Sequence, residues 1–206
     1  RQIGGHTALH QQEGTTFGNA TLSITANSAD GNGSYLIFGN QRSGSTGGNT
    51  IVQSGDEVGT IRFAASDGTD MNSSAAQIRC EIDSTPGSND MPGRLLFSTT
   101  ADGSASASER LRIDSSGRIL IGDDTAENTM GLNARVQTFG TDASTSGVAI
   151  RRGSNDAQAA FLVMSKSRNA SVGSRTILQN GDEVGNIFFA ADDGTDLVSN
   201  TAAIKS

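Results

Sequence analysis

Short stretches of alternating apolar and polar residues occur throughout this chain and predict β-strands. In Ala76–Asp83 the apolar Ile78, Cys80 and Ile82 fall on one face, and charged residues fall on the other. Other stretches are continuous apolar runs bounded by glycine, which are typical of buried strands. Further strands are expected at Thr21–Thr25, Ser34–Gly39, Thr50–Gln53, Val58–Ala65, Arg94–Thr99, Gly147–Ile150 and Ala160–Met164.

Turn-forming residues separate these stretches. Glu109–Asp114, a Ser-Ser-Gly turn and Arg118–Gly122 predict a compact β-hairpin. Ser84–Pro92 holds both prolines and is expected to be a loop, because proline donates no hydrogen bond to a sheet. Helical periodicity is absent, and Ser104–Leu111 is the one stretch that allows a turn of helix. The pattern predicts an all-β protein.

One stretch occurs twice. Gly55–Asp70 (GDEVGTIRFAASDGTD) recurs 126 residues later as Gly181–Asp196 (GDEVGNIFFAADDGTD), and 19 of 30 positions are identical between Thr50–Arg79 and Thr176–Lys205. We therefore expect a first β-module over residues 1–126, beginning with the tail of a preceding module. Residues 127–206 are expected to form a second copy that lacks its C-terminal part. The period exceeds the 20–50 residues of solenoid repeats, so whole domains are expected to repeat along a stalk.

Composition limits how such modules can be stabilised. Only 34% of residues are hydrophobic, 4% are aromatic, and 26 of 206 are glycine. A chain this poor in large apolar side chains is expected to complete its core against identical chains, because apolar burial is the main term that offsets chain entropy. The net charge of −7 argues against a nucleic-acid partner. No apolar run is long enough to insert in a membrane. Cys80, the single cysteine, is expected to be a small strand residue.

The acidic residues of the duplicated stretch allow three interpretations. Adjacent Asp56 and Glu57 point to opposite faces of a strand, which argues against an acid–base pair. A calcium loop would require more oxygen ligands and a terminal bidentate Glu, so at most a weak cation site remains open. We favour a structural role in turns. The expected turn residues are Gly55, Asp56, Asp67, Gly68, Asp70, Gly181, Asp182, Asp193, Gly194 and Asp196.

His6 and His10 are the only histidines, and apolar Leu132 and Val136 stand 126 residues further on. If three chains met at these positions, six imidazoles could bind a metal. The alternative is a frayed terminus, and no metal or other cofactor is expected. Serine nucleophiles lack a G-x-S-x-G turn and a histidine partner, so the chain is not expected to be an enzyme. The aromatic residues are expected to lie in the core: Phe17, Tyr35, Phe38, Phe63 and Phe97.

Glu109–Gly122 (ERLRIDSSGRILIG) resembles a motif of bacteriophage tail-fibre and side-fibre proteins. The order of GDEVGTIRFAASDGTD, AAQIRCEID and GRLLFSTT before it is also similar to these fibres. The resemblance implies Gly-rich modules, β-sandwich-like or β-prism-like, that are intertwined as a homotrimeric fibre. Triple-stranded β-helices and side-by-side sandwiches both remain open. Many such fibres carry a C-terminal self-cleaving chaperone domain, which the present sequence does not show.

The resulting hypothesis is a structural and adhesive fibre protein of a phage virion. Its expected partners are identical chains, other virion structural proteins and a host surface glycan or protein receptor, and the assembled fibre is expected to be extracellular. The alternatives are a bacterial surface adhesin or carbohydrate-binding module and, third, a fibre-borne glycan depolymerase. Positions that differ between the copies, such as Arg62 against Phe188 and Asn72 against Val198, are where a ligand is expected to bind.

Overall fold

A computed structural model describes residue 8 and residues 10–206 of the chain. It divides into two compact units, Arg1–Asp124 and Thr125–Ser206. The only helical element among the described residues is the short 3₁₀ helix η1, Phe17–Ala20, and all others are β-strands. The expected all-β fold is thereby confirmed.

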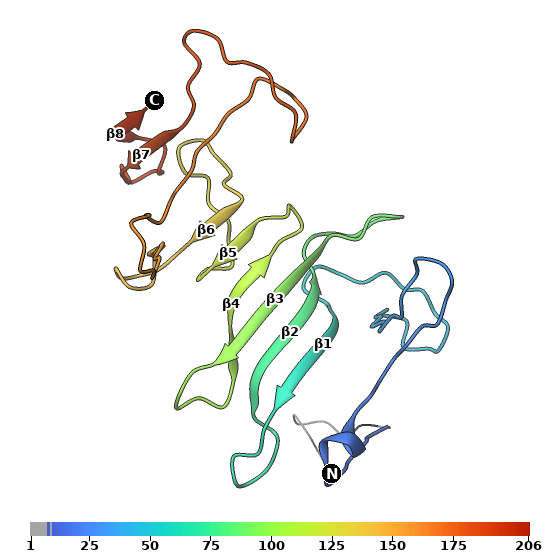
Figure 1. Ribbon diagram of the computed structural model, residues 1–206. Helices are drawn as coiled ribbons and strands as arrows, with labels where there is room; N and C mark the ends of the chain where they lie inside the picture. The colour runs from blue at the N-terminus through green and yellow to red at the C-terminus, as the bar shows by residue number, and fades with distance from the viewer. Residues whose placement is uncertain (1–7, 9) are drawn as a thin grey trace. The chain divides into compact units, whose positions relative to one another are not determined.

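The first unit contains a meander of five antiparallel strands, in which neighbours in sequence are neighbours in the sheet (Figure 1). Apolar and polar residues alternate along these strands, so the sheet has one aliphatic face and one face that carries charges. The strands are β1 (Glu57–Ala64), β2 (Ser74–Ile82), β3 (Gly93–Thr100), β4 (Ala107–Ile113) and β5 (Ile119–Ile121).

The hairpin predicted from Glu109–Gly122 is confirmed as β4 and β5. Its turn begins at Asp114, whose backbone N–H donates to the carbonyl of Arg118 at 3.1 Å. Gly117 closes the turn with a φ of +73°, a conformation that favours glycine. Asp114 Oδ1 accepts from the backbone N–H groups of Ser116 and Arg118, each at 2.9 Å. These bonds fix the register of both strands.

Most of the residues that the chain buries in this sheet lie on its charged face, and Ile82, 1% exposed at the end of β2, is the buried residue of the aliphatic face. Arg79, Leu96, Arg112 and Leu120 stand opposite one another across β2, β3, β4 and β5. Leu96 and Leu120 are 2% and 1% exposed, and Arg112 between them is 7% exposed. Arg112 Nη2 donates to Glu109 Oε2 at 2.8 Å and Nη1 to the carbonyl of Asp124 at 2.9 Å. Burial of this guanidinium is therefore accompanied by charged and hydrogen-bonded partners.

The second unit contains the short strand β6 (Val136–Thr138) and the antiparallel hairpin of β7 (Asn186–Ala190) and β8 (Asn200–Lys205). In register, Ile187 pairs with Ile204 and Phe189 with Ala202. Every residue of β8 is exposed.

Several strands expected from the sequence are absent from the described residues. Thr21–Thr25, Ser34–Gly39, Thr50–Gln53, Gly147–Ile150 and Ala160–Met164 form no strand. Most of these segments are strongly exposed, and a strand forms only where another strand accepts its backbone hydrogen bonds. The turn of helix allowed at Ser104–Leu111 is also absent, because this stretch enters β4 at Ala107.

Candidate functional site

A two-pronged ion pair of the first unit joins Arg42 to Asp56. Arg42 Nε and Nη2 donate to the two carboxylate oxygens of Asp56 at 2.6 and 2.7 Å. The backbone N–H of Gln53 donates to Asp56 Oδ2 at 2.9 Å, and Arg42 N–H donates to the carbonyl of Thr50 at 3.1 Å. A two-pronged arginine–carboxylate pair of this kind holds both ends of the loop between them.

The same arrangement occurs 126 residues later. Arg168 Nε and Nη2 donate to Asp182 at 2.6 and 2.8 Å, and the N–H of Gln179 donates to Asp182 Oδ2 at 2.9 Å. Sequence reasoning assigned Asp56 and Asp182 to turns but did not find their arginine partners. The signal was present, because Arg42 and Arg168 stand at the same offset of 126 residues as the two acids.

The second pair of acidic loops also has matching geometry. Asp67 Oδ1 accepts from the N–H groups of Thr69 and Asp70 at 2.8 and 3.0 Å, and Asp193 Oδ1 accepts from Thr195 and Asp196 at 2.9 and 3.2 Å. Carboxylates engaged by local backbone donors organise turns. The glycines expected in these turns have positive φ: +86° at Gly55, +94° at Gly68, +89° at Gly181 and +91° at Gly194.

These contacts stabilise the ionised carboxylates. The hydrogen bonds from Arg42 lower the pKa of Asp56 to about 2, with a further contribution from the N–H of Gln53. Arg168 and Gln179 lower the pKa of Asp182 to about 2 in the same way. Backbone donors of Asp70 and Thr69 lower the pKa of Asp67. A carboxylate with a lowered pKa is a poor proton carrier near neutral pH.

The hypothesis of a metal site formed by His6 and His10 requires three chains and stays a prediction. His10 is exposed, and His6 lies outside the described residues. Within residue 8 and residues 10–206, no three His, Cys, Asp or Glu side chains gather in a way that could hold a metal ion. The same residues contain no helix with the length and apolar character to cross a membrane.

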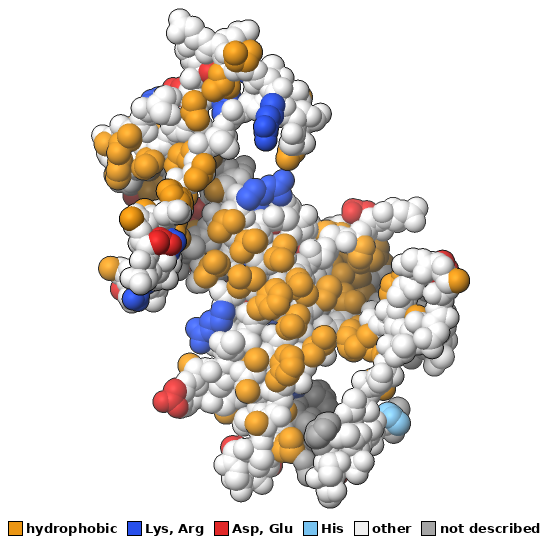
Figure 2. All heavy atoms as spheres, in the orientation of Figure 1, with side chains coloured by type: hydrophobic (Ala, Val, Ile, Leu, Met, Phe, Trp, Pro, Cys, Tyr) orange, Lys and Arg blue, Asp and Glu red, His pale blue; other side chains and the backbone are white. Residues whose placement is uncertain are grey.

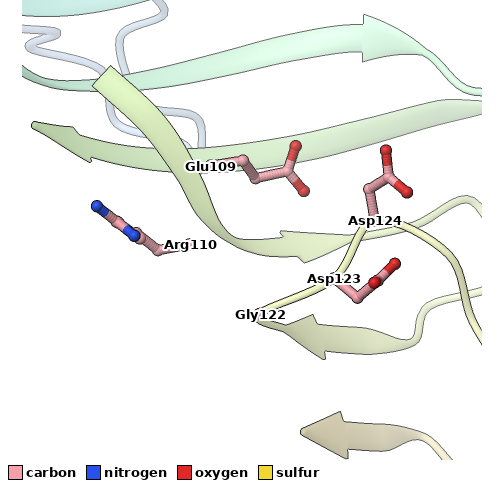
Figure 3. Close-up of a pocket in the computed structure, with 5 residues that line it drawn as sticks. All are labelled: Glu109, Arg110, Gly122, Asp123 and Asp124. Carbon is pink, nitrogen blue, oxygen red and sulfur yellow. The ribbon is translucent and has the colours of Figure 1, made fainter. Parts of the chain in front are cut away.

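A hollow of about 300 Å³ lies beside the start of β4 (Figure 3). It is lined by Glu109, Arg110, Gly122, Asp123 and Asp124. Glu109 and the carbonyl of Asp124 both accept hydrogen bonds from buried Arg112. Arg110 points away from the three carboxylates in Figure 3 and donates to Thr99 Oγ1 at 3.2 Å. We interpret this hollow as the solvent-facing side of the contacts that Arg112 makes with Glu109 and Asp124.

The second unit has a larger and more apolar hollow of about 570 Å³. Gln137, one of its polar residues, accepts from the N–H of Glu127 at 2.9 Å and donates to the carbonyls of Glu127 and Ala134 at 3.0 and 3.1 Å. The side-chain amide of Gln137 is therefore hydrogen-bonded within the chain, whereas ligand pockets present polar groups to the ligand. The apolar lining includes Met130, Leu132, Val136, Phe139, Phe188 and Leu197.

A further candidate surface is the aliphatic face of the five-stranded sheet, which we call the open face. Strand pairing places Ile61, Ile78, Phe97, Leu111 and Ile121 directly opposite one another in a single row across β1 to β5. Figure 2, in the orientation of Figure 1, shows hydrophobic side chains gathered over this sheet. The two ends of the row, Ile61 and Ile121, are 43% and 37% exposed.

A second row on the open face runs beside the first: Gly59, Cys80, Leu95, Ile113 and Ile119. Cys80 is a half-buried free thiol within β2, as expected for a small strand residue. Leu95 and Ile113 are each 37% exposed. None of the ten residues in the two rows is charged. Contiguous uncharged apolar surface is a feature that interaction sites of soluble proteins share.

The aromatic residues are not in the core of the single chain, contrary to expectation. Tyr35 is 73% exposed, Phe38 48% and Phe63 53%, and only Phe97 is partly covered. The side chain of Phe17 lies outside what the structure describes. The buried apolar residues are Val52, Ile82, Leu96 and Leu120. Sequence patterns identified residues that require apolar cover, but this chain does not provide it.

The fold can be compared with known proteins. Neither protein-family profiles nor curated protein sequences match the chain. Among solved structures, it is similar to the carboxy-terminal domain of the bacteriophage T5 L-shaped tail fibre, with a TM-score of 0.66 and 15% identity over 90% of this chain and 76% of the other.

A second solved structure contains that tail-fibre domain together with its intramolecular chaperone domain. It matches with the same TM-score of 0.66 and 15% identity, over 90% of this chain and 52% of its own length. At this identity the likeness concerns the fold and assigns no role to any residue. The chain has an all-β fold similar to that of a phage tail-fibre domain.

Proposed function

We propose that this chain is a structural and adhesive component of a phage fibre, in which three copies assemble through their open faces. The observation that carries the proposal is the row Ile61, Ile78, Phe97, Leu111 and Ile121, an uncharged apolar stripe that is half-buried in its middle and exposed at both ends in a tail-fibre-like fold. Apolar burial contributes about 25 cal/mol per Å², so covering this stripe in an assembly is strongly favourable.

Closed assembly also explains how the chain can avoid aggregation. β1 lies at an edge of the meander, and exposed sheet edges pair readily with other chains. A closed cyclic assembly covers such sheet edges and ends at a fixed number of copies. The number of copies, three, comes from the resemblance to fibre sequences. In this assembly the charged face remains internally satisfied through Arg112 and its partners.

The remaining parts of the proposal follow from that role. The fibre is part of the virion, is extracellular when assembled, contacts other virion structural proteins and contributes to binding a host surface glycan or protein. The loops that differ between the two units, around Asn72 and Val198, are the proposed contact points. No catalytic role is proposed, because the ordered acids Asp56 and Asp182 are held ionised by arginine.

A bacterial surface adhesin or carbohydrate-binding module is the alternative, since the same β-repeat could stand on a cell. A binding module that works as a single chain would leave the open face exposed to water. The mass of the protein in solution therefore separates the trimeric fibre from a binding module that works as a single chain.

Size-exclusion chromatography with multi-angle light scattering tests the assembly. The expected mass is three times the chain mass of 21.1 kDa. Leu111→Asp places a charge in the middle of the apolar row and is expected to reduce the mass to that of one chain. Met91→Asp is the matched control, because Met91 is 61% exposed in the loop between β2 and β3, and this variant should keep the wild-type mass.

A monomeric wild-type protein would exclude the trimeric fibre. Adhesion is tested separately, by measuring whether beads coated with the assembled protein bind host bacteria. Saturation of this binding by soluble protein is expected, and assembled protein that binds no bacterium infected by the parent phage would overturn the adhesive part.

A further inference from the structure

Two apolar segments of four residues, Tyr35–Phe38 and Phe161–Met164, are exposed to solvent in the single chain. Exposure of this much apolar surface is unfavourable in water. Tyr35, Leu36 and Ile37 are 73%, 61% and 81% exposed. Their counterparts 126 residues later, Phe161, Leu162 and Val163, are 70%, 71% and 76% exposed. Successive side chains of an extended segment point to opposite sides, so each segment is open on both sides. A surface strand of one sheet would expose only alternate residues.

Each segment is nevertheless held at its C-terminal end. A Cβ atom on Gly59 would come within 2.4 Å of Phe38 Cβ, so Phe38 lies directly against the glycine of β1. Met164 lies against Gly185 in the same way, with a corresponding distance of 2.6 Å. Asn40 Nδ2 then donates to the carbonyl of Glu57 at 2.7 Å. The segments are thus presented from fixed ends and are not loose tails.

The recurrence of this arrangement limits what can cover it. A partner has to present two apolar surfaces that recur with the same period as the segments, and a second copy of this chain does so. Ile61 and Phe63 of β1 are 43% and 53% exposed, and Ile187 and Phe189 of β7 are 43% and 50% exposed. These matched exposures, 126 residues apart, provide the same apolar surface in each unit.

Charge points to the same partner. Each chain carries a formal charge of −7, so copies repel one another except where they meet through uncharged surface. Neither Tyr35–Phe38 nor Phe161–Met164 contains an ionisable group that is charged at neutral pH, and the hairpin residues Ile61 and Phe63 are uncharged. Contact through these elements brings copies together without burying a charge.

We propose that Tyr35–Phe38 and Phe161–Met164 are contact segments that a neighbouring copy covers, each packing on the exposed apolar residues of the β1 or β7 hairpin of that copy. This inference rests on the proposed assembly and adds the segments through which copies exchange contacts. Four extended residues span roughly 13 Å, enough to cross two to three strands spaced about 4.8 Å apart.

Tyr35 reports directly on this contact, because it is the only tyrosine and the chain has no tryptophan. Tyrosine fluorescence is therefore quenched by acrylamide in proportion to the exposure of this one segment. The quenching constant of the assembled protein is expected to be several-fold lower than that of the same protein dissociated by dilution, with light scattering run on both samples. A trimer in which acrylamide reaches Tyr35 as easily as in the single chain would overturn the inference and leave the proposed function standing. A single-chain mass for the undiluted protein would overturn both.

Substitutions test the same contact independently. Ile37→Asp and Val163→Asp each place a charge in a contact segment, and each is expected to raise the dissociation constant of the assembly by more than about 100-fold. Val172→Asp is the matched control, because Val172 is fully exposed in a turn outside both segments, and its assembly should be unchanged. Circular dichroism verifies that the sheet is retained. Wild-type assembly in both Ile37→Asp and Val163→Asp would contradict the inference.

Discussion

The hairpins β1–β2 and β7–β8 have closely similar sequences and the same register, but they differ in burial. Ile61 pairs with Ile78 in the first, and Ile187 pairs with Ile204 in the second. The first strand of each hairpin is equally exposed, since Ile61 in β1 and Ile187 in β7 are both 43% exposed. The second strands differ in exposure, because Ile78 in β2 is half-buried whereas Ile204 in β8 is 61% exposed.

The difference has one structural cause. β3 pairs with the free edge of β2 over seven residue pairs, whereas β7 and β8 form a two-stranded sheet. Cross-strand neighbours shield one another, so β3 converts the partly exposed β2 into a central strand. The duplicated stretch therefore specifies the register of a hairpin. In the first unit, strands β3 to β5 bury the side chains of β2, which remain exposed in the equivalent strand β8. An isolated two-stranded hairpin is marginal in water, which makes stability unequal between the two units.

Weakening the packing of β3 should have the largest effect on stability. Leu96 is 2% exposed in β3, and Leu96→Ala is expected to lower the free energy of unfolding of the first unit by about 3 kcal/mol. Hydrogen exchange by mass spectrometry should show faster exchange in β1 and β2 and no change in β7 and β8. Faster exchange in both hairpins would show that the second hairpin also depends on β3.

The buried ion pair of the same face ranks next. Arg112→Ala leaves Glu109, whose side chain is 25% exposed, without its charged partner. The expected loss is about 2 kcal/mol, less than for a fully buried pair because solvent reaches the glutamate. Urea denaturation of Arg112→Ala beside Arg112→Ala/Glu109→Ala checks this value. The double variant should recover part of the loss, and an equal loss in both would assign the effect to packing alone.

The hairpins themselves are compared by matched truncation. Ile78→Ala is expected to cost about 1 kcal/mol, because Ile78 is only partly covered within one chain. Ile204→Ala at the equivalent position should cost less than about 0.5 kcal/mol, since that side chain is 61% exposed. Urea denaturation under identical conditions gives both values. Equal losses would contradict the assignment of cover to β3.

The smallest effect concerns acid stability. The pKa of Asp56 and of Asp182 is lowered to about 2 from the ordinary value of 3.8, so the unfolded chain binds more protons than the folded chain between these values. Each pair therefore contributes stability above about pH 4 that is lost as the pH falls toward 2. Asp56→Asn and Asp182→Asn should each flatten the fall in stability over this range, and by similar amounts. Thermal unfolding from pH 5 to pH 2 measures the slope, and an unchanged slope in both variants would exclude the arginine pairs as its origin.

Alternating segments could be predicted well from the sequence. β2 lies within the expected strand Ala76–Asp83 apart from its first residues, and the β4–β5 hairpin agrees with Glu109–Gly122. Alternation specifies a single buried face, and within this chain a neighbouring strand is available to pair. The turn at Asp114–Arg118 was also readable, because its Asp-Ser-Ser-Gly residues form their hydrogen bonds locally.

Continuous apolar runs were less predictable. Ser34–Gly39 and Ala160–Met164 have the composition of buried strands but form none, because a strand with two apolar faces requires neighbours on both sides. Periodicity cannot state which molecule provides them. The open face escaped detection for a related reason: alternation separates two faces, but it does not show that the charged one is buried around Arg112.

The sequential order of the meander has a consequence for folding kinetics. Paired residues are close along the chain, from Glu57 with Glu81 to Ile113 with Ile119. The arginine–aspartate pairs span 14 residues in each unit. Low sequence separation between contacts accelerates folding, since little chain entropy is lost before each contact forms. Each strand can therefore pair soon after it leaves the ribosome, and the five-stranded sheet can form within a single chain.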